Sequence, residues 1–147
     1  MQRNAFGFTL IELIMVMVIT GILAAVVGPR FFDRQVFDER MFFEESIGAV
    51  RYAQKLALAS GCFTQVSLGS GGYHVRQAAG CTSGGYSLEV IAADGQSPYA
   101  NTLPGGVTVT PTSLPVVFDS LGKPGSAASA TIGTFTLNVA AETGLVQ

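Results

Sequence analysis

The sequence predicts an α+β protein in which a long N-terminal α-helix packs on an antiparallel β-sheet or a small β-sandwich head. Phe8 to Val27 is a run of 20 residues whose only charged residue is Glu12. Residues 31–60 keep apolar residues near helical spacing. From residue 61 onward, short apolar runs alternate with Gly, Pro, Asp and Ser. We therefore predict a transmembrane helix segment over 8–30, an amphipathic helix segment over 31–60 and a β-rich head over 61–147.

The membrane-length run comes first. At about 1.5 Å per residue, a helix over this run crosses a hydrocarbon core of roughly 30 Å. A secretory signal peptide has a more basic start and a shorter apolar region of about 7–15 residues, so the run is typical of a retained anchor. Gly21 weakens a helix locally and Pro29 removes a backbone donor, so we expect a kink at these two positions.

The amphipathic segment follows as a continuation of the helix. Ser60-Gly61 is a typical helix stop. Asp38, Glu39 and Arg40 are expected on a surface that faces solvent or another subunit. The apolar stripe that we expect against the head contains Phe43, Ile47, Val50, Ala57 and Leu58.

The head is predicted to be built from short strands. Gly69-Ser70-Gly71-Gly72 lies between two strand-like runs and predicts a hairpin. The expected strands cover residues 62–68, 72–77, 86–92, 106–110, 115–119, 131–139 and the final 142–147.

Gly7-Phe8-Thr9-Leu10-Ile11-Glu12, followed by the apolar run, Gly21 and Gly28-Pro29, resembles the N-terminus of type IV prepilins and pseudopilins. The resemblance implies that residues 1–7 are a leader and that a prepilin peptidase cuts after Gly7. It also implies that Phe8 becomes an N-methylated N-terminus and that Glu12 acts in assembly. A buried charge needs a partner, so Glu12 would pair with the Phe8 amine of a neighbouring subunit or of its own chain. The plainer alternative for Glu12 is an acid tolerated near the membrane interface and the positive end of the helix.

Three stretches after residue 50 resemble one group within this family. Residues 51–57, 116–125 and 134–147 are similar to the helix end, strand-and-turn and closing hairpin of GspH/FimT-type minor pilins. Some members of the FimT branch bind DNA through arginines at the closing hairpin, whereas Gly144 to Gln147 carries no base. The net charge is −2, and a nucleic-acid surface would need clustered basic residues. We therefore expect no nucleic-acid partner.

The resemblance implies a structural role. The chain is expected to be a subunit of a type IV pilus-like filament, as a minor pilin that primes assembly or stands near the tip, where cell adhesion is a further role. Its partners would be other pilin subunits through the N-terminal helix, prepilin peptidase, the inner-membrane assembly platform and the lipid bilayer. The subunit would be held in the bacterial inner membrane with its head in the periplasm, and then in an extracellular or periplasmic filament. A count of Arg residues beside the membrane favours the opposite orientation. Two alternatives remain open, a minor pseudopilin of a type II secretion system and a membrane-anchored binding protein that never polymerises.

The two cysteines are compatible with a disulfide in such a compartment. If the hairpin turn is centred between Ser70 and Gly71, Cys62 lies opposite residue 79 and close to Cys81. We favour a disulfide over two buried thiols, and over a metal site that would use both cysteines and His74.

The sequence holds no recognisable catalytic site. The glycine-rich turn at 69–72 lacks the lysine and following helix of a phosphate loop, and Ser60 and Ser120 have no neighbouring histidine and acid. Glu89, Asp94 and Asp119 could form a carboxylate pair or a calcium site, but surface acids are more common. Tyr73, Tyr86, Tyr99 and Phe118 belong either to the core or to a binding patch. We therefore expect no enzyme activity, no metal and no cofactor.

Overall fold

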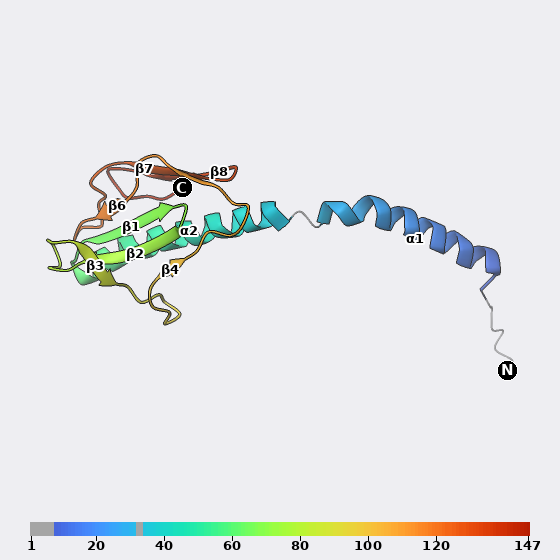
Figure 1. Cartoon of the computed structure of the whole chain (residues 1–147), viewed down its shortest axis with the longest axis horizontal. Coiled ribbons are helices and arrows are strands. Elements are labelled where there is room, and N and C mark those ends of the chain that lie inside the picture. The colour runs from blue at the N-terminus through green and yellow to red at the C-terminus, as the bar shows by residue number, and fades with distance from the viewer. Residues whose placement is uncertain (1–7, 32–33) are drawn as a thin grey trace, which may run out of the picture. The chain divides into compact units, whose positions relative to one another are not determined.

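The structure, a computed structural model, describes residues 8–31 and 34–147, and for residues 27–31 it describes the backbone alone. The chain forms two compact units, Met1–Arg34 and Gln35–Gln147, and each is described by itself. The described residues form two α-helices and two antiparallel sheets, so the predicted α+β class is confirmed (Figure 1).

The first helix, α1, spans Leu10–Phe31. It passes through Gly21 and Pro29 as one continuous α-helix, and the expected kink stays a prediction. Within the described part of the chain, no helix combines the length and the apolar character needed to cross a membrane. The predicted transmembrane segment over 8–30 includes residues whose side chains are not described, and it also stays a prediction.

The second helix, α2, spans Arg34–Ser60 and supplies one wall of the head. It ends where the sequence predicts: Gly61 takes a positive φ of 69° and donates its N–H to the Ala57 carbonyl oxygen at 2.9 Å. The buried face of α2 contains Glu39, Phe42, Ser46, Ile47, Ala49, Val50, Ala53 and Ala57.

Two expectations about α2 are wrong. Leu58 is 54% exposed, because the buried stripe ends at Ala57. Glu39 was expected on the surface but is only 7% exposed, because a turn at Gly133 lies directly over its carboxylate. Its Oε1 accepts a hydrogen bond from Gln35 Nε2 at 3.3 Å. A Cβ atom at position 133 would overlap the Glu39 carboxylate, so glycine is required there for space as well as for its positive φ of 55°.

The first sheet has the strand order β3-β2-β1-β6, with β4 also paired to β2. The β1–β2 hairpin pairs Gly69 with Gly72, which confirms the predicted turn centre between Ser70 and Gly71. The strand β4 was not predicted, because two residues are too few to give a periodic signal. The bounds are β1 Thr64–Gly69, β2 Gly72–Ala78, β3 Tyr86–Glu89, β4 Ala100–Asn101 and β6 Val116–Phe118.

The second sheet has the order β5-β7-β8, formed by Val109–Pro111, Ala128–Ile132 and Phe135–Val139. The single strand expected over 131–139 is wrong, because a tight turn at Gly133 divides it into β7 and β8. The expected closing strand over 142–147 forms only an isolated bridge between Val139 and Val146.

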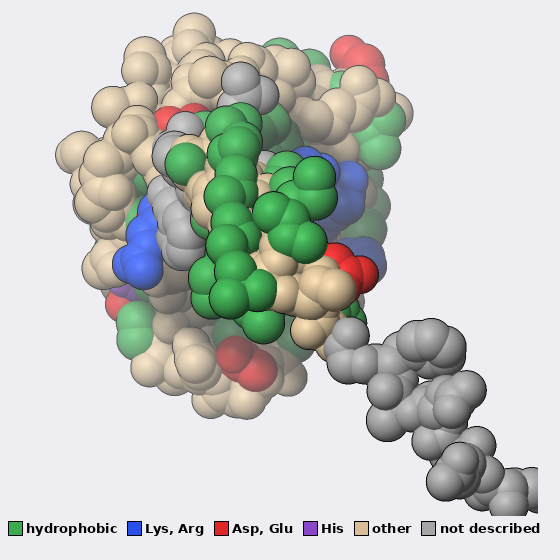
Figure 2. Space-filling view, turned by 90° about the vertical axis from the view of Figure 1, so that its right-hand side faces the viewer, with side chains coloured by type: hydrophobic (Ala, Val, Ile, Leu, Met, Phe, Trp, Pro, Cys, Tyr) green, Lys and Arg blue, Asp and Glu red, His purple; other side chains and the backbone are tan. Residues whose placement is uncertain are grey.

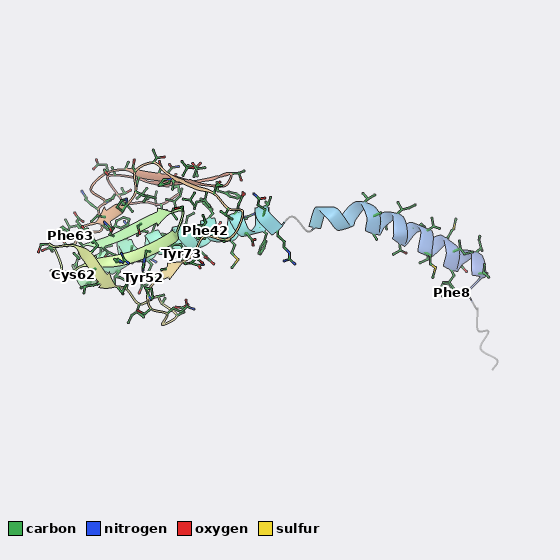
Figure 3. The ribbon with its side chains drawn as sticks, viewed as in Figure 1. Phe8, Phe42, Tyr52, Cys62, Phe63 and Tyr73 are labelled. Atoms are coloured by element: carbon green, nitrogen blue, oxygen red, sulfur yellow. A yellow bond between two sulfur atoms is a disulfide. The ribbon has the colours of Figure 1, made fainter. Side chains whose placement is uncertain are left out.

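Both sheets share one hydrophobic core with α2. Phe42 on α2 packs on Tyr73 of β2, and the two ring centroids are 5.8 Å apart. Figure 3 labels both residues in the head. On the other side, Phe43 stacks on Phe135 of β8 at 5.2 Å. Figure 1 shows α2 running along the strands of the head. The helix therefore joins two sheets that are not hydrogen-bonded to each other.

Polar side chains on α2 hold the C-terminal part of the chain in place. Gln54 Nε2 donates hydrogen bonds to the carbonyl oxygens of Gly122 and Thr143, at 3.0 and 2.9 Å. Arg51 Nη2 donates to the Val146 carbonyl oxygen at 3.3 Å. One glutamine thereby fixes two separate turns on the same helix.

The predicted disulfide is present. Cys62 and Cys81 are bonded at an S–S distance of 2.11 Å, across a sequence separation of 19 residues. The same contact brings the Phe63 amide to the Cys81 carbonyl oxygen at 2.7 Å. The bond ties the end of α2 to the loop that follows β2.

Replacing both cysteines by serine should lower the free energy of unfolding by about 3 kcal/mol, because the open chain gains loop entropy in the unfolded state. Urea unfolding of the full chain in a non-ionic detergent, followed by tyrosine fluorescence, measures this change. Reductant should destabilise the native chain by a similar amount and leave the double variant unaffected. Without reductant, an equal free energy of unfolding for the native chain and the double serine variant would refute the prediction.

Substitution Gln54→Ala should lower the free energy of unfolding by about 1–2 kcal/mol, because two carbonyl oxygens lose their donor. The matched control is Lys55→Ala, which alters an exposed neighbour of similar helix propensity. The same urea experiment should find the control within about 0.5 kcal/mol of the native chain. A control as unstable as Gln54→Ala would show that the loss comes from the helix and not from the two turns.

Candidate assembly site at the start of the N-terminal helix

The first turn of α1 is closed by a reciprocal pair of side chains, Thr9 and Glu12. Glu12 Oε2 accepts the Thr9 backbone N–H at 3.1 Å and the Thr9 hydroxyl at 3.0 Å. In return, the Glu12 backbone N–H donates to Thr9 Oγ1 at 3.3 Å. Thr9 is thus the N-cap, and Glu12 is the third helical residue. This is a capping box, which satisfies backbone donors that the helix itself leaves free.

The capping box was missed in the sequence, although its signal is readable there. Thr9-Leu10-Ile11-Glu12 matches the S/T-x-x-E pattern that stands immediately before an apolar helix. The charge of Glu12 is the more obvious feature of this stretch, and Thr9 carries no charge. Glu12 therefore has a local structural role in a single chain, in addition to any role toward a neighbour.

Hydrogen bonding does not neutralise Glu12. In the ranges 8–31 and 34–147, ion pairs are found only around Glu89, with His74 and Arg76. The Glu12 carboxylate therefore has no cation beside it in the described residues. Both bonds from Thr9 go to Oε2, so Oε1 remains open to a further donor.

The other N-terminal site residues are placed as follows. Gly7, the expected cleavage point, lies outside the described residues. Phe8 is 84% exposed and immediately precedes the N-cap. Figure 3 labels it beside the start of α1. Cleavage after Gly7 would therefore place the new amine one residue before Thr9, close in sequence to the carboxylate that caps the helix.

The surface of α1 is apolar. Figure 2 shows hydrophobic side chains on the face of this helix that is turned toward the viewer. So large a continuous apolar surface does not persist in water without a covering lipid or protein. The exposed large apolar residues of this segment include Leu10, Ile11, Leu13, Ile14, Met15, Val16, Met17, Val18, Ile19, Ile22, Leu23 and Val26.

The polar residues of the head that were considered for catalysis or metal binding lie in separate contacts. Glu89 pairs with His74 at 3.0 Å, and Asp119 Oδ1 accepts the amides of Leu121 and Lys123 in a turn. The alternative in which both cysteines bind a metal is wrong, because the two sulfurs are joined to each other. Among the described residues, no three His, Cys, Asp or Glu side chains are grouped so as to hold a metal ion.

Two comparisons with known proteins give a match. Residues 2–28 match the family described as Prokaryotic N-terminal methylation motif. The structure resembles the crystal structure of the type IV minor pilin FimU from Pseudomonas aeruginosa, with a TM-score of 0.52 and 13% sequence identity. That likeness covers 74% of this chain and 85% of the other, and at this identity it concerns the fold. No curated protein matches the sequence significantly.

The methylation motif implies processing by a prepilin peptidase. The chain therefore carries the prokaryotic N-terminal methylation motif over residues 2–28, and its fold resembles that of a type IV minor pilin.

Proposed function

We propose that the chain is a structural subunit of a type IV pilus-like filament, in the role of a minor pilin that primes assembly or stands near the tip. The observation that carries the proposal is a charged carboxylate, Glu12, which caps the first turn of an otherwise apolar helix that begins within the methylation motif. The minor-pilin fold of the neighbour in the structural comparison supports the choice of a minor subunit.

The apolar helix has two uses in this proposal. Before assembly, residues 8–30 hold the subunit in the inner membrane with the head in the periplasm, and the lipid covers the exposed side chains of α1. After assembly, helices of neighbouring subunits cover the same side chains in the filament core. Apolar contacts of this kind are non-directional and cannot by themselves select one axial position along the helix.

Glu12 sets the axial position of one helix against its neighbour, which the apolar contacts leave undetermined. In the filament core the carboxylate leaves water, and the Thr9 hydrogen bonds satisfy Oε2 without removing the charge. The N-methylated amine of Phe8 on a neighbouring subunit is a cation that can reach the free Oε1. A desolvated carboxylate is strongly destabilising without such a partner, so subunits that enter out of register are rejected.

The first step of the proposal, cleavage after Gly7 and methylation of Phe8, can be tested on the native protein. In the native host, with an active prepilin peptidase, intact mass and N-terminal peptide mapping should find a chain that begins at N-methylated Phe8. The Gly7→Val chain should keep Met1, because the bulkier residue blocks the cleavage point. A native chain that keeps Met1 would refute the proposal, and a start near Val26 would identify a secretory signal peptide.

The charge and the cap of Glu12 can be separated by substitution. In Glu12→Gln the amide oxygen still accepts the Thr9 bonds, but the charge is lost. We expect incorporation into filaments to fall by at least about tenfold, because a broken buried ion pair costs about 3–5 kcal/mol. Quantitative blotting of sheared filaments against membrane fractions measures incorporation.

The matched variant is Thr9→Val, which removes the hydroxyl of the cap and keeps the charge. It should weaken the start of α1 by about 1 kcal/mol and leave incorporation within about threefold of the native level. If Thr9→Val loses incorporation while Glu12→Gln keeps it, the carboxylate acts as a cap and not as an assembly charge. A chain that never polymerises would tolerate both substitutions.

A further inference from the structure

The head contains an acidic, tyrosine-lined pocket that has no part in the N-terminal site. Its volume is about 510 Å³, and its walls come from α2, from strands β2 and β4, and from the loop before β4. No Lys, Arg or His lines it in the described part of the chain. The lining residues are Glu45, Tyr73, Ala92, Asp94, Gln96, Tyr99, Ala100 and Asn101.

The two carboxylates of the pocket come from different elements of the head, α2 and the loop before β4. Glu45 Oε2 on α2 accepts a hydrogen bond from Asn101 Nδ2 at 2.7 Å, which fixes the side chain and leaves Oε1 without a hydrogen bond among the described residues. Asp94 Oδ1 accepts the Gln96 amide at 3.0 Å within a turn closed from Ala92 to Gln96. Both acids are therefore positioned by the fold without being neutralised by it.

Tyr73 places a free hydroxyl group at the pocket. The residue is only 7% exposed and it lines the pocket, while its hydroxyl oxygen is accessible and has no hydrogen-bond partner among the described residues. A ligand in the pocket can therefore form a hydrogen bond with this group. Burial, and after it the charge of Glu45, raises the pKa of Tyr73 to about 12, so the hydroxyl stays protonated beside the two acids.

The aromatic rings form the remaining wall. Tyr99 meets Tyr73 edge-on with ring centroids 6.0 Å apart, and it meets Tyr52 in the same way at 5.0 Å. The Tyr52 hydroxyl donates to the Ile91 carbonyl oxygen at 2.9 Å, which ties the start of the loop to α2. The pocket thus combines a rigid π-surface with two uncompensated negative charges.

We propose that this pocket binds the guanidinium group of an arginine side chain presented by a partner protein. A guanidinium is planar, carries several N–H donors for the two carboxylates, and stacks on tyrosine rings. A calcium ion needs six to eight oxygen ligands, whereas the pocket offers only two carboxylates. Among the described residues, no three His, Cys, Asp or Glu side chains are grouped so that they could hold a metal ion. The ammonium of lysine balances the negative charge of the carboxylates, but it stacks less well on tyrosine rings than a guanidinium does.

The test uses the full chain in a neutral detergent, with its tyrosine rings labelled with ¹³C for NMR. The chain has four tyrosines, so the ring signals are few, and Tyr86 on β3 lies outside the pocket and serves as the internal control. The probe is N-acetylarginine amide, and its neutral counterpart is N-acetylcitrulline amide. We expect saturable shifts of the Tyr73 and Tyr99 signals with the arginine probe, none at Tyr86, and none with citrulline.

Substitutions locate the binding site. Glu45→Gln and Asp94→Asn should each weaken binding of the arginine probe by roughly fivefold, and the double variant should abolish it. Glu44→Gln changes an exposed acid on the same helix that does not line the pocket, and it should bind as the native chain does. Equal shifts with citrulline, equal loss with Glu44→Gln, or displacement of the arginine probe by micromolar calcium would each overturn the proposal.

Discussion

The head depends on one constraint, which is that neither sheet has a core without α2. The two sheets have no strand in common, and both contribute to one core with the same helix. Ala49, Ala53 and Ala57 of this helix are fully buried and recur every four residues, so they lie on one face of it. Phe42 and Phe43, adjacent in sequence, extend toward opposite sheets. Packing the helix is therefore the step that makes the two sheets into one domain.

Much of this architecture was predictable, because its signals are local. Four residues with three glycines fixed the β1–β2 register, and that register brought Cys62 near Cys81. The errors have non-local causes. Glu39 has the sequence appearance of a surface acid, and only the turn at Gly133, far along the chain, covers it. Gly133 was included in an apolar strand because a single glycine in such a run does not reveal a turn.

The two candidate sites differ in the same way. The Thr9–Glu12 capping box lies within four consecutive residues, so its whole pattern is present in the sequence. The charge of Glu12 is simply the more obvious feature of these residues. The acidic pocket joins Glu45, Tyr73 and Asp94, which are separated by dozens of residues and meet only through the fold. Spacing along the chain carries no sign of such a site. What reveals it is the arrangement in space, in which two acids without a neighbouring cation lie beside a tyrosine hydroxyl that has no hydrogen-bond partner among the described residues.

Both sites rest on the difference between hydrogen bonding and charge neutralisation. Thr9 satisfies the Glu12 carboxylate, and Asn101 satisfies Glu45, yet each acid keeps its full charge. In water that charge is tolerated, because solvent and salt screen it. Once a second molecule covers it, the same charge becomes strongly unfavourable unless the arriving surface brings a cation. An acid that is oriented but not neutralised therefore discriminates between partners, since it admits those with a matching positive charge and rejects the others. In this chain the discrimination would act twice, on the helix toward like subunits and on the head toward a different partner.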